Sequence, residues 1–273
     1  MNTPKNDTEL AVGDGKIAAR NGNTIAYSIR GNGPWITFLH ALMGNGNFWR
    51  DQVSQLSHHF TVLTIDLRGH GDSDAPAGPY TMDAMADDVV DVLDGLGVMR
   101  THLVGASMGG LVAQSVAARY ADRIGQLVLA NTTYRYGPEH HAGWEARITT
   151  VMQSGLAAVI PGTLARFLTD VFRDVHPEAV SALGKQMERT SAAGFISCCK
   201  ALDGADIGAY HGMIKAPTLL IAGKKDPATT VEVMADLQSR IIGANLVTLD
   251  SAHLSNVEQP EKFTEALKEF FLQ

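Results

Sequence analysis

The chain has little cysteine, no excess of basic residues and no long apolar run. Its two cysteines, Cys198 and Cys199, are adjacent, and neighbouring cysteines rarely bridge, so no disulfide framework is expected. The 29 acidic residues outnumber the 22 lysines and arginines, which leaves a net charge of −7 and argues against nucleic-acid binding. No apolar run reaches the length of about 18 residues that a membrane span needs, and Met1–Asp7 lacks the apolar stretch of a secretory signal. These absences predict a cytoplasmic, globular protein.

Apolar segments typical of strands alternate with segments of helical periodicity along most of the 273 residues. The turn signal Asn21-Gly22-Asn23 joins the first two strands as a hairpin. Strands that alternate with helices predict an α/β fold, with a mostly parallel eight-stranded sheet flanked by helices. The expected strands are 16–20, 24–30, 35–39, 60–67, 101–104, 127–130, 218–222 and 246–249. The expected helices between and after them are 49–56, 80–96, 111–120, 231–239 and 260–271.

The stretch 137–213 breaks this alternation, because it contains no convincing strand and several helical segments, among them 164–171 and 178–189. An insertion after the sixth strand lies over the carboxyl edge of the sheet, where open α/β folds bind ligands. We therefore predict a core formed by 1–136 and 214–273, and an all-helical cap, 137–213, that covers the active site.

The sequence Gly105-Ala106-Ser107-Met108-Gly109 follows an apolar strand and precedes a helix. This strand–G-x-S-x-G–helix arrangement is the nucleophile elbow of serine hydrolases, in which the flanking glycines permit a sharp turn. It predicts that Ser107 is a catalytic nucleophile exposed above the sheet edge.

A serine nucleophile needs a base that is held in place by an acid, here in the chain order Ser, acid, His. His253 follows the last strand and Asp226 follows the strand before it, so both are expected at the same sheet edge as Ser107. Asp250 is a rival acid, whereas the position after the sixth strand holds Asn131 and not a carboxylate. The pairs His58-His59 and His140-His141 lack metal-ligand spacing, so we expect surface histidines and no metal site.

The oxyanion that forms during acyl transfer needs two preset donors. The backbone N–H of Met108, directly after the nucleophile, is the first. The loop 40–46 after the third strand is expected to supply the second, and the predicted donor is the N–H of Leu42. His40 is expected to shape this loop.

These residues, together with Asp66-Leu67-Arg68-Gly69-His70-Gly71-Asp72-Ser73, resemble the α/β-hydrolase superfamily over nearly the whole chain. Within it the chain is most similar to 3-oxoadipate enol-lactonases, through 78–81, 131–137, the Trp144/Arg147 pair and 252–258. The resemblance implies an α/β-hydrolase fold and a small lactone substrate that carries a carboxylate. It makes Arg135, Trp144 and Arg147 candidate substrate-binding residues, with pairing of the arginines to cap acids as the alternative. The chain departs from these lactonases at Met43, where they usually have glycine.

The combined prediction is a cofactor-free serine hydrolase that cleaves small-molecule esters or lactones through an acyl-enzyme. Three alternatives stay open: a carbon–carbon bond hydrolase of ring-fission products, a metal-free haloperoxidase or perhydrolase, and a small-molecule receptor with slow turnover. No partner in the form of nucleic acid or membrane is expected, and self-association into a homo-oligomer is left open.

Overall fold

The structure, a computed structural model, describes residues 13–272 and is built around one eight-stranded sheet. The strand order is β1-β2-β4-β3-β5-β6-β7-β8. β2 runs antiparallel to both of its neighbours, and every other neighbouring pair is parallel. The strands are β1 (Gly13–Ala18), β2 (Thr24–Arg30), β3 (Trp35–Leu39), β4 (Thr61–Ile65), β5 (Thr101–Ala106), β6 (Ile124–Ala130), β7 (Thr218–Gly223) and β8 (Asn245–Leu249). The predicted α/β class and mostly parallel eight-stranded sheet are confirmed.

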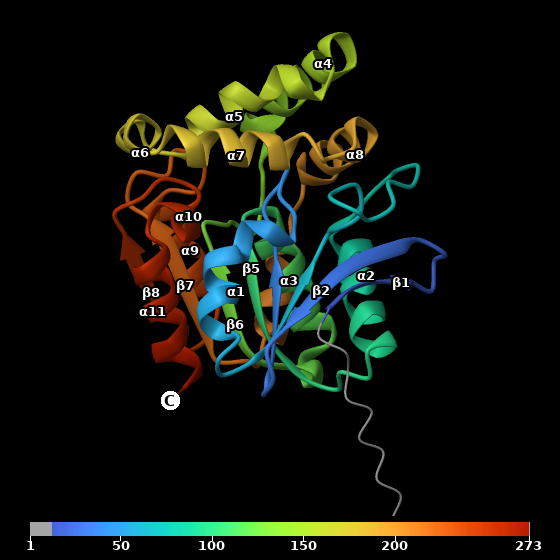
Figure 1. Ribbon diagram of the computed structural model, residues 1–273, viewed down its shortest axis with the longest axis vertical. Coiled ribbons are helices and arrows are strands. Elements are labelled where there is room, and N and C mark those ends of the chain that lie inside the picture. Colours follow the sequence, from blue (N-terminus) through green and yellow to red (C-terminus); the bar gives the residue numbers. More distant parts are fainter. Residues whose placement is uncertain (1–12, 273) are drawn as a thin grey trace, which may run out of the picture.

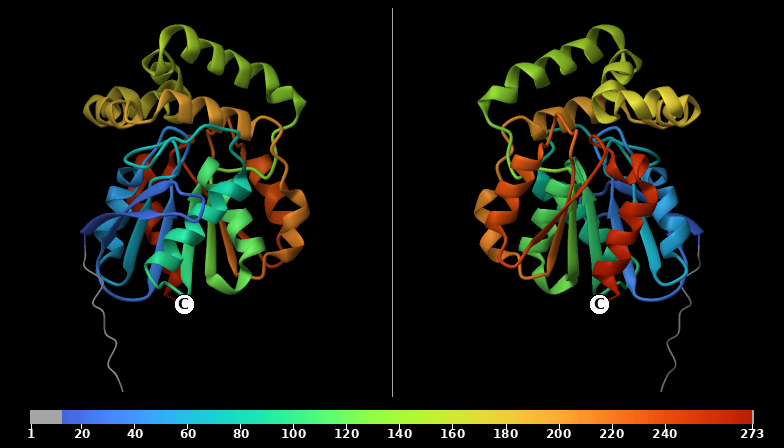
Figure 2. Two further views of the ribbon diagram at one scale, coloured as in Figure 1. Left: turned by 90° about the vertical axis from the view of Figure 1, so that its right-hand side faces the viewer. Right: turned by 90° about the vertical axis from the view of Figure 1, so that its left-hand side faces the viewer.

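Helices cover both faces of the sheet because its central strands are apolar on both sides; every residue of β4 is buried. Helices α1 and α11 contact each other, as do α2 and α3, and Figure 2 shows the two pairs on opposite faces. The helices outside the segment 137–213 are α1 (Arg50–Leu56), α2 (Met82–Gly95), α3 (Met108–Arg119), α9 (Val231–Arg240), α10 (Ser255–Glu258) and α11 (Pro260–Phe271). Between residues 13 and 272, no helix has the length and apolarity needed to cross a lipid bilayer.

The segment 137–213 forms helices that lie together as a layer above one edge of the sheet (Figures 1 and 2). They are α4 (His141–Ser154), α5 (Ile160–Phe167), α6 (Asp170–Val175), α7 (Pro177–Met187) and α8 (Ala192–Leu202). The segment that enters this layer and the segment that leaves it are paired by backbone hydrogen bonds. The Tyr136 N–H donates to the Ala205 carbonyl at 2.8 Å, and the Ile207 N–H donates to the Tyr134 carbonyl at 3.0 Å. The division into a core and a cap domain with these bounds stays a prediction of the sequence.

The predicted helix over 164–171 is wrong, because the chain breaks between α5 and α6. Leu168 is extended, with φ −125° and ψ 144°. The Thr169 hydroxyl then accepts the N–H of Phe172 at 3.2 Å and begins a new helix. A Thr N-cap interrupts an otherwise continuous apolar periodicity here. Two strands also begin earlier than predicted: β1 at Gly13, which is paired with Ile29, and β6 at Ile124, which is paired with Thr101.

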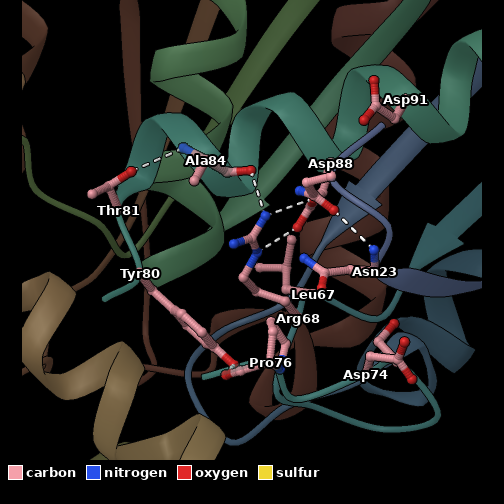
Figure 3. A network of polar contacts seen from close by, with 12 residues as sticks. Asn23, Leu67, Arg68, Asp74, Pro76, Tyr80, Thr81, Ala84, Asp88 and Asp91 are labelled. Carbon is pink, nitrogen blue, oxygen red and sulfur yellow. Dashed lines mark hydrogen bonds and ion pairs between the residues drawn. The ribbon is translucent and has the colours of Figure 1, made fainter. Parts of the chain in front are cut away.

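A buried ion pair anchors the loop that follows β4 to helix α2. Figure 3 shows the Arg68 guanidinium between the Asp88 carboxylate, with N–O distances of 2.5 and 2.7 Å, and the Ala84 carbonyl at 3.0 Å. The next residue, Gly69, meets Gly194 of α8 so closely that a Cβ on Gly194 would lie 2.4 Å from the Gly69 Cα. The loop therefore connects the sheet to the helical layer above it.

Candidate active site

Ser107 lies in the sharp turn between β5 and α3, at a backbone conformation that non-glycine residues seldom adopt (φ 52°, ψ −117°). A Cβ on Gly105 would lie 2.3 Å from the Gly109 carbonyl oxygen, and one on Gly109 would lie 2.4 Å from the Leu39 carbonyl oxygen. Only glycine fits at both positions, which is the close approach that the G-x-S-x-G pattern predicts.

His253 and Asp226 lie beside Ser107 in a continuous line of hydrogen bonds. Ser107 Oγ is 2.8 Å from His253 Nε2, and His253 Nδ1 is 2.7 Å from Asp226 Oδ2. With the proton on Nδ1 donated to the carboxylate, Nε2 is free to accept the serine proton. The rival acid, Asp250, instead pairs with Lys225 at 2.9 Å. The structure thus brings together the three residues that the sequence selected, drawn from three separate strand ends.

The Asp226 carboxylate is buried and saturated with donors. Burial by itself raises its pKa, but the attraction of His253 and the hydrogen bonds from His253 and Thr229 outweigh this and lower the pKa to about 2. Oδ2 accepts the Thr229 hydroxyl at 2.6 Å and the Asn131 amide at 3.1 Å, and Oδ1 accepts the Ala228 N–H at 2.7 Å. The acid is therefore ionised and fixed in orientation at neutral pH.

Sequence reasoning missed Asn131 and Thr229 as partners of the acid. Asn131 has φ 45°, and its amide also donates to the Ala252 carbonyl at 3.2 Å, next to His253. A buried non-glycine residue in the left-handed region points to a functional constraint. That signal is visible only in the backbone geometry.

The loop 40–46 after β3 lies beside Ser107, with Leu42 lining the same cavity as Ser107 and His253. Within residues 13–272, neither the Leu42 N–H nor the Met108 N–H donates a hydrogen bond, so both are free for a substrate oxygen. His70 Nε2 accepts the Met43 N–H at 3.1 Å and holds the loop in place. Met43, which replaces the expected glycine, has φ 64°, the left-handed conformation that favours glycine.

His40 anchors the start of the same loop. Its Nε2 accepts the Leu67 N–H at 2.9 Å, and its Nδ1–H donates to the Ala41 carbonyl at 2.8 Å. Both ring nitrogens are therefore used in shaping the loop, and neither is available to act as a base.

Ser107 and His253 open into a cavity of about 240 Å³ between the sheet edge and the helical layer. Its wall is mainly apolar and aromatic, and its charged residues are Glu139, Arg147 and Arg166. A larger groove of about 820 Å³, between β2 and α1, contains neither Ser107 nor His253. The residues that line the smaller cavity are Leu42, Ser107, Tyr136, Glu139, His140, Gly143, Trp144, Arg147, Arg166, Phe167, Leu202, Ala228 and His253.

Arg147 and Arg166 give this cavity a local positive field in an acidic protein. Burial, and then the charge of nearby Arg166, lower the pKa of Arg147 from its ordinary value. In the described part of the chain, no carboxylate lies within 4.0 Å of either guanidinium. Arg147 is instead held over the Trp144 ring, with 5.1 Å between its Cζ and the ring centroid. Guanidinium groups bind carboxylates bidentately, and these two outnumber the one carboxylate of the lining, Glu139.

The structure does not bring Arg135 to this cavity. Its side chain is exposed and lies over the Tyr134 ring, with 5.6 Å between Cζ and the centroid, while its backbone pairs with Asp206. The backbone pairing of 134–136 with 205–207 leaves the Arg135 side chain facing outward. Arg166, which sequence reasoning missed, takes the place expected for Arg135, and His140 lines the cavity although a surface position was expected.

Among the described residues, His141, Glu145 and Asp203 are the group whose geometry could hold a metal ion, with ligand atoms within 4.8 Å of one another. His141 Nδ1 is already 2.6 Å from Asp203 Oδ2, and His141 and Glu145 are exposed to solvent. Because exposed acidic groups of this kind are common, they give no reason to assign a metal centre.

A central strand that ends in a serine elbow, within a mostly parallel sheet, is the architecture of an α/β hydrolase. The family model of the alpha/beta hydrolase fold matches residues 34–260. The chain is 36% identical to 3-oxoadipate enol-lactonase 2 of Acinetobacter baylyi over 86% of this chain and 87% of that protein. It is also similar to the crystal structure of the enol-lactonase from Burkholderia xenovorans, with a TM-score of 0.91, 36% identity, and coverage of 95% and 100% of the two chains.

A thermophilic esterase from Thermogutta terrifontis is a more distant neighbour, with a TM-score of 0.87, 28% identity, and coverage of 94% and 97% of the two chains. Because the family model matches most of the chain, this protein belongs to the α/β hydrolase fold family.

Proposed function

We propose that this protein is a serine hydrolase of carboxylic esters or lactones, with Ser107 as nucleophile, His253 as general base and Asp226 as the acid that orients it. The observation that carries the proposal is the line of hydrogen bonds of 2.8 and 2.7 Å through these residues, at the wall of a cavity of about 240 Å³. Its substrates are small molecules, in keeping with the size of that cavity.

In the acylation step, Ser107 Oγ attacks the substrate carbonyl while its proton passes to His253 Nε2. The imidazolium that forms is stabilised by Asp226, whose carboxylate stays ionised because its pKa is about 2. The N–H groups of Leu42 and Met108 hold the oxyanion. Its collapse breaks the bond to the alkoxy or enol oxygen, which takes the proton from His253.

In the deacylation step, His253 accepts a proton from water, and the resulting hydroxide attacks the acyl-enzyme. Collapse of the second tetrahedral intermediate returns the proton to Ser107 and releases the acid. For a lactone the leaving oxygen stays in the same molecule, and the enol released from an enol-lactone tautomerises to a ketone. Each step uses side chains and backbone N–H groups of this protein, together with water.

The preferred substrate is a lactone or ester that carries a free carboxylate, bound by Arg147 and Arg166. This assignment rests on the two unpaired guanidinium groups in the cavity, and on the similarity to proteins named 3-oxoadipate enol-lactonases. Trp144 supports it by holding Arg147 over its ring. The remainder of the cavity wall is apolar and accommodates the carbon skeleton.

Substrate hydrolysis with matched pairs of lactones and esters, with and without a carboxylate, tests both parts of the proposal. Ser107→Ala is expected to lower kcat by about 10⁴-fold or more on every substrate, and near-normal turnover by this variant would refute the nucleophile. Arg147→Gln and Arg166→Gln are each expected to raise KM by about 10- to 100-fold on carboxylated substrates only, since each removes hydrogen bonds to a charged group.

Arg135→Gln is the matched control for the arginine variants, because it removes the same charge outside the cavity. Equal effects of Arg135→Gln and Arg147→Gln would contradict the anion site and leave the hydrolase assignment intact. A preference for neutral substrates would likewise contradict the anion site and leave the hydrolase assignment intact. Location in the cytoplasm remains a separate expectation from the sequence, and self-association into a homo-oligomer stays open.

A further inference from the structure

Glu258, the last residue of α10, is a buried carboxylate that pairs with no cation within residues 13–272. Its ligands are neutral donors. Oε1 accepts the Ala252 N–H at 2.8 Å, and Oε2 accepts the Thr169 hydroxyl at 2.6 Å. The Thr169 N–H is 3.3 Å from both oxygens. Burial of a charged group costs free energy unless its hydrogen bonds are satisfied. The presence of a carboxylate here, without a cation as partner, therefore needs an explanation.

The donors come from two segments that are 83 or more residues apart, and within residues 13–272 the hydrogen bonds that link 167–169 to 252–254 run through this carboxylate and one further backbone bond. Ala252 precedes the proposed base, His253. Thr169 belongs to the break between α5 and α6 in the helical layer. On the other side of the base, the Leu254 N–H donates to the Phe167 carbonyl at 3.1 Å. Both neighbours of His253 are thus tied to the segment 167–169, one directly and one through Glu258.

This attachment places the Phe167 ring against the imidazole of His253, with 4.6 Å between the ring centroids. Phe167 is 4% exposed and lines the cavity. It therefore shields one face of the base from water and limits the rotation of the ring. Phe167 is the last residue of α5, and the bonds at 167–169 fix this end of the helix beside His253.

We propose that Glu258 is a positioning residue that clamps the segment 167–169 onto the loop of the base, and so keeps the Phe167 ring packed against His253 during catalysis. This inference rests on the proposed role of His253. An amide at position 258 has one oxygen instead of two, and its NH₂ group faces an N–H or O–H that also needs an acceptor. Glu258→Gln preserves the shape of the side chain and breaks the clamp.

The first measurement is the rate constant at which a small sulfonyl fluoride modifies Ser107, because it reports the alignment of serine and base without reference to the natural substrate. Modification of the wild type and not of Ser107→Ala tests the proposed nucleophile separately. Glu258→Gln is expected to lower the rate constant by about 10- to 100-fold, the effect of a displacement of about 1 Å at a catalytic group. Glu261→Gln, which removes an exposed carboxylate at the start of α11, is the control and should react like the wild type.

Thr169 gives an independent route to the same clamp. Thr169→Val removes the hydroxyl and should slow modification, whereas Thr169→Ser keeps it and should not. The double variant Glu258→Gln/Thr169→Val should be no slower than the slower single variant, since both changes break one interaction. If the two single-variant decreases in the rate constant multiply in the double variant, Glu258 and Thr169 act separately, and the proposal is overturned. If Glu258→Gln does not fold, the Thr169 pair carries the test.

Hydrogen exchange provides a readout that global destabilisation does not reproduce. In Glu258→Gln, amides of 167–173 and of 250–257 should exchange faster together, while β5 and α3 keep their wild-type rates. Faster exchange in one segment alone, or a uniform increase over the whole chain, would overturn the proposal. Unchanged modification of Ser107 in both Glu258→Gln and Thr169→Val would do the same.

Discussion

Acidification from pH 6.5 is expected to destabilise the protein through two buried histidines: His40, at the start of the loop 40–46, and His70, which accepts a hydrogen bond from that loop. Burial lowers the pKa of His40 to about 4, and burial together with the nearby His40 lowers the pKa of His70 to about 3. In the unfolded chain a histidine has a pKa of about 6.5. Over this window the unfolded state therefore binds two protons that the folded state does not, and the free energy of unfolding falls as the pH falls.

Each histidine lowers the free energy of unfolding by up to about 1.4 kcal/mol per pH unit within its window. Between pH 6.5 and 4.5 the pair is expected to lower it by about 4–5 kcal/mol, after allowance for the partial protonation of unfolded histidines at pH 6.5. This is a large share of the stability of a typical domain. Asp66, whose pKa is raised by burial, opposes the trend at lower pH, because it binds a proton in the folded state first.

Urea denaturation followed by circular dichroism at pH 4.5, 5.5 and 6.5 measures this dependence. His70→Gln retains an acceptor for the Met43 N–H and removes one titrating group, so the loss over the same range should shrink to about 2 kcal/mol. His58→Gln, at an exposed position, should behave like the wild type. Equal losses in the wild type and in His70→Gln would refute the reasoning, since His70 would then not be held neutral by the fold.

Three further substitutions test the site and its support. Asp226→Asn should lower kcat by about 10⁴-fold in hydrolysis assays, because the amide oxygen will face the backbone donors and its NH₂ group will face His253; a loss below tenfold would contradict the role of the acid. Arg68→Met leaves Asp88 buried without its cation and should lower the urea-derived free energy of unfolding by about 3–5 kcal/mol. An effect below about 1 kcal/mol would mean that the pair behaves as an exposed one. Gly109→Ala forces a Cβ to 2.4 Å from a backbone oxygen and should lower both thermal stability and sulfonyl fluoride labelling, with no change in either as the contradicting result.

The sheet and the three proposed catalytic residues could be predicted because their signals are local. The tight turn around Ser107 needs glycine on both sides, and this requirement appears in five consecutive residues. Asp226 and His253 each follow a strand, and the carboxyl ends of parallel strands meet at one edge whatever the details of packing. The α/β class follows in the same way from the alternation of apolar strands and amphipathic helices.

The contacts across the helical layer could not be predicted, because they depend on which way each helix faces after it packs. Arg135 and Arg166 are both arginines near the predicted site, but only Arg166 lines the cavity. Apolar periodicity continues across the break at Leu168, where a threonine cap and a carboxylate from α10 end one helix and start the next.

The sequence by itself determined the order of strands and helices, the elbow around Ser107 and the chain order of its proposed partners. The tertiary structure decided what surrounds them: the donors on Asp226, the arginines in the cavity and the bonds of Glu258. The acid is contacted by Asn131, 95 residues away, and Glu258 by Thr169, 89 residues away. Such contacts leave no periodic pattern in the sequence, because a hydrogen bond between distant segments requires one suitable side chain on each and nothing from the residues between them.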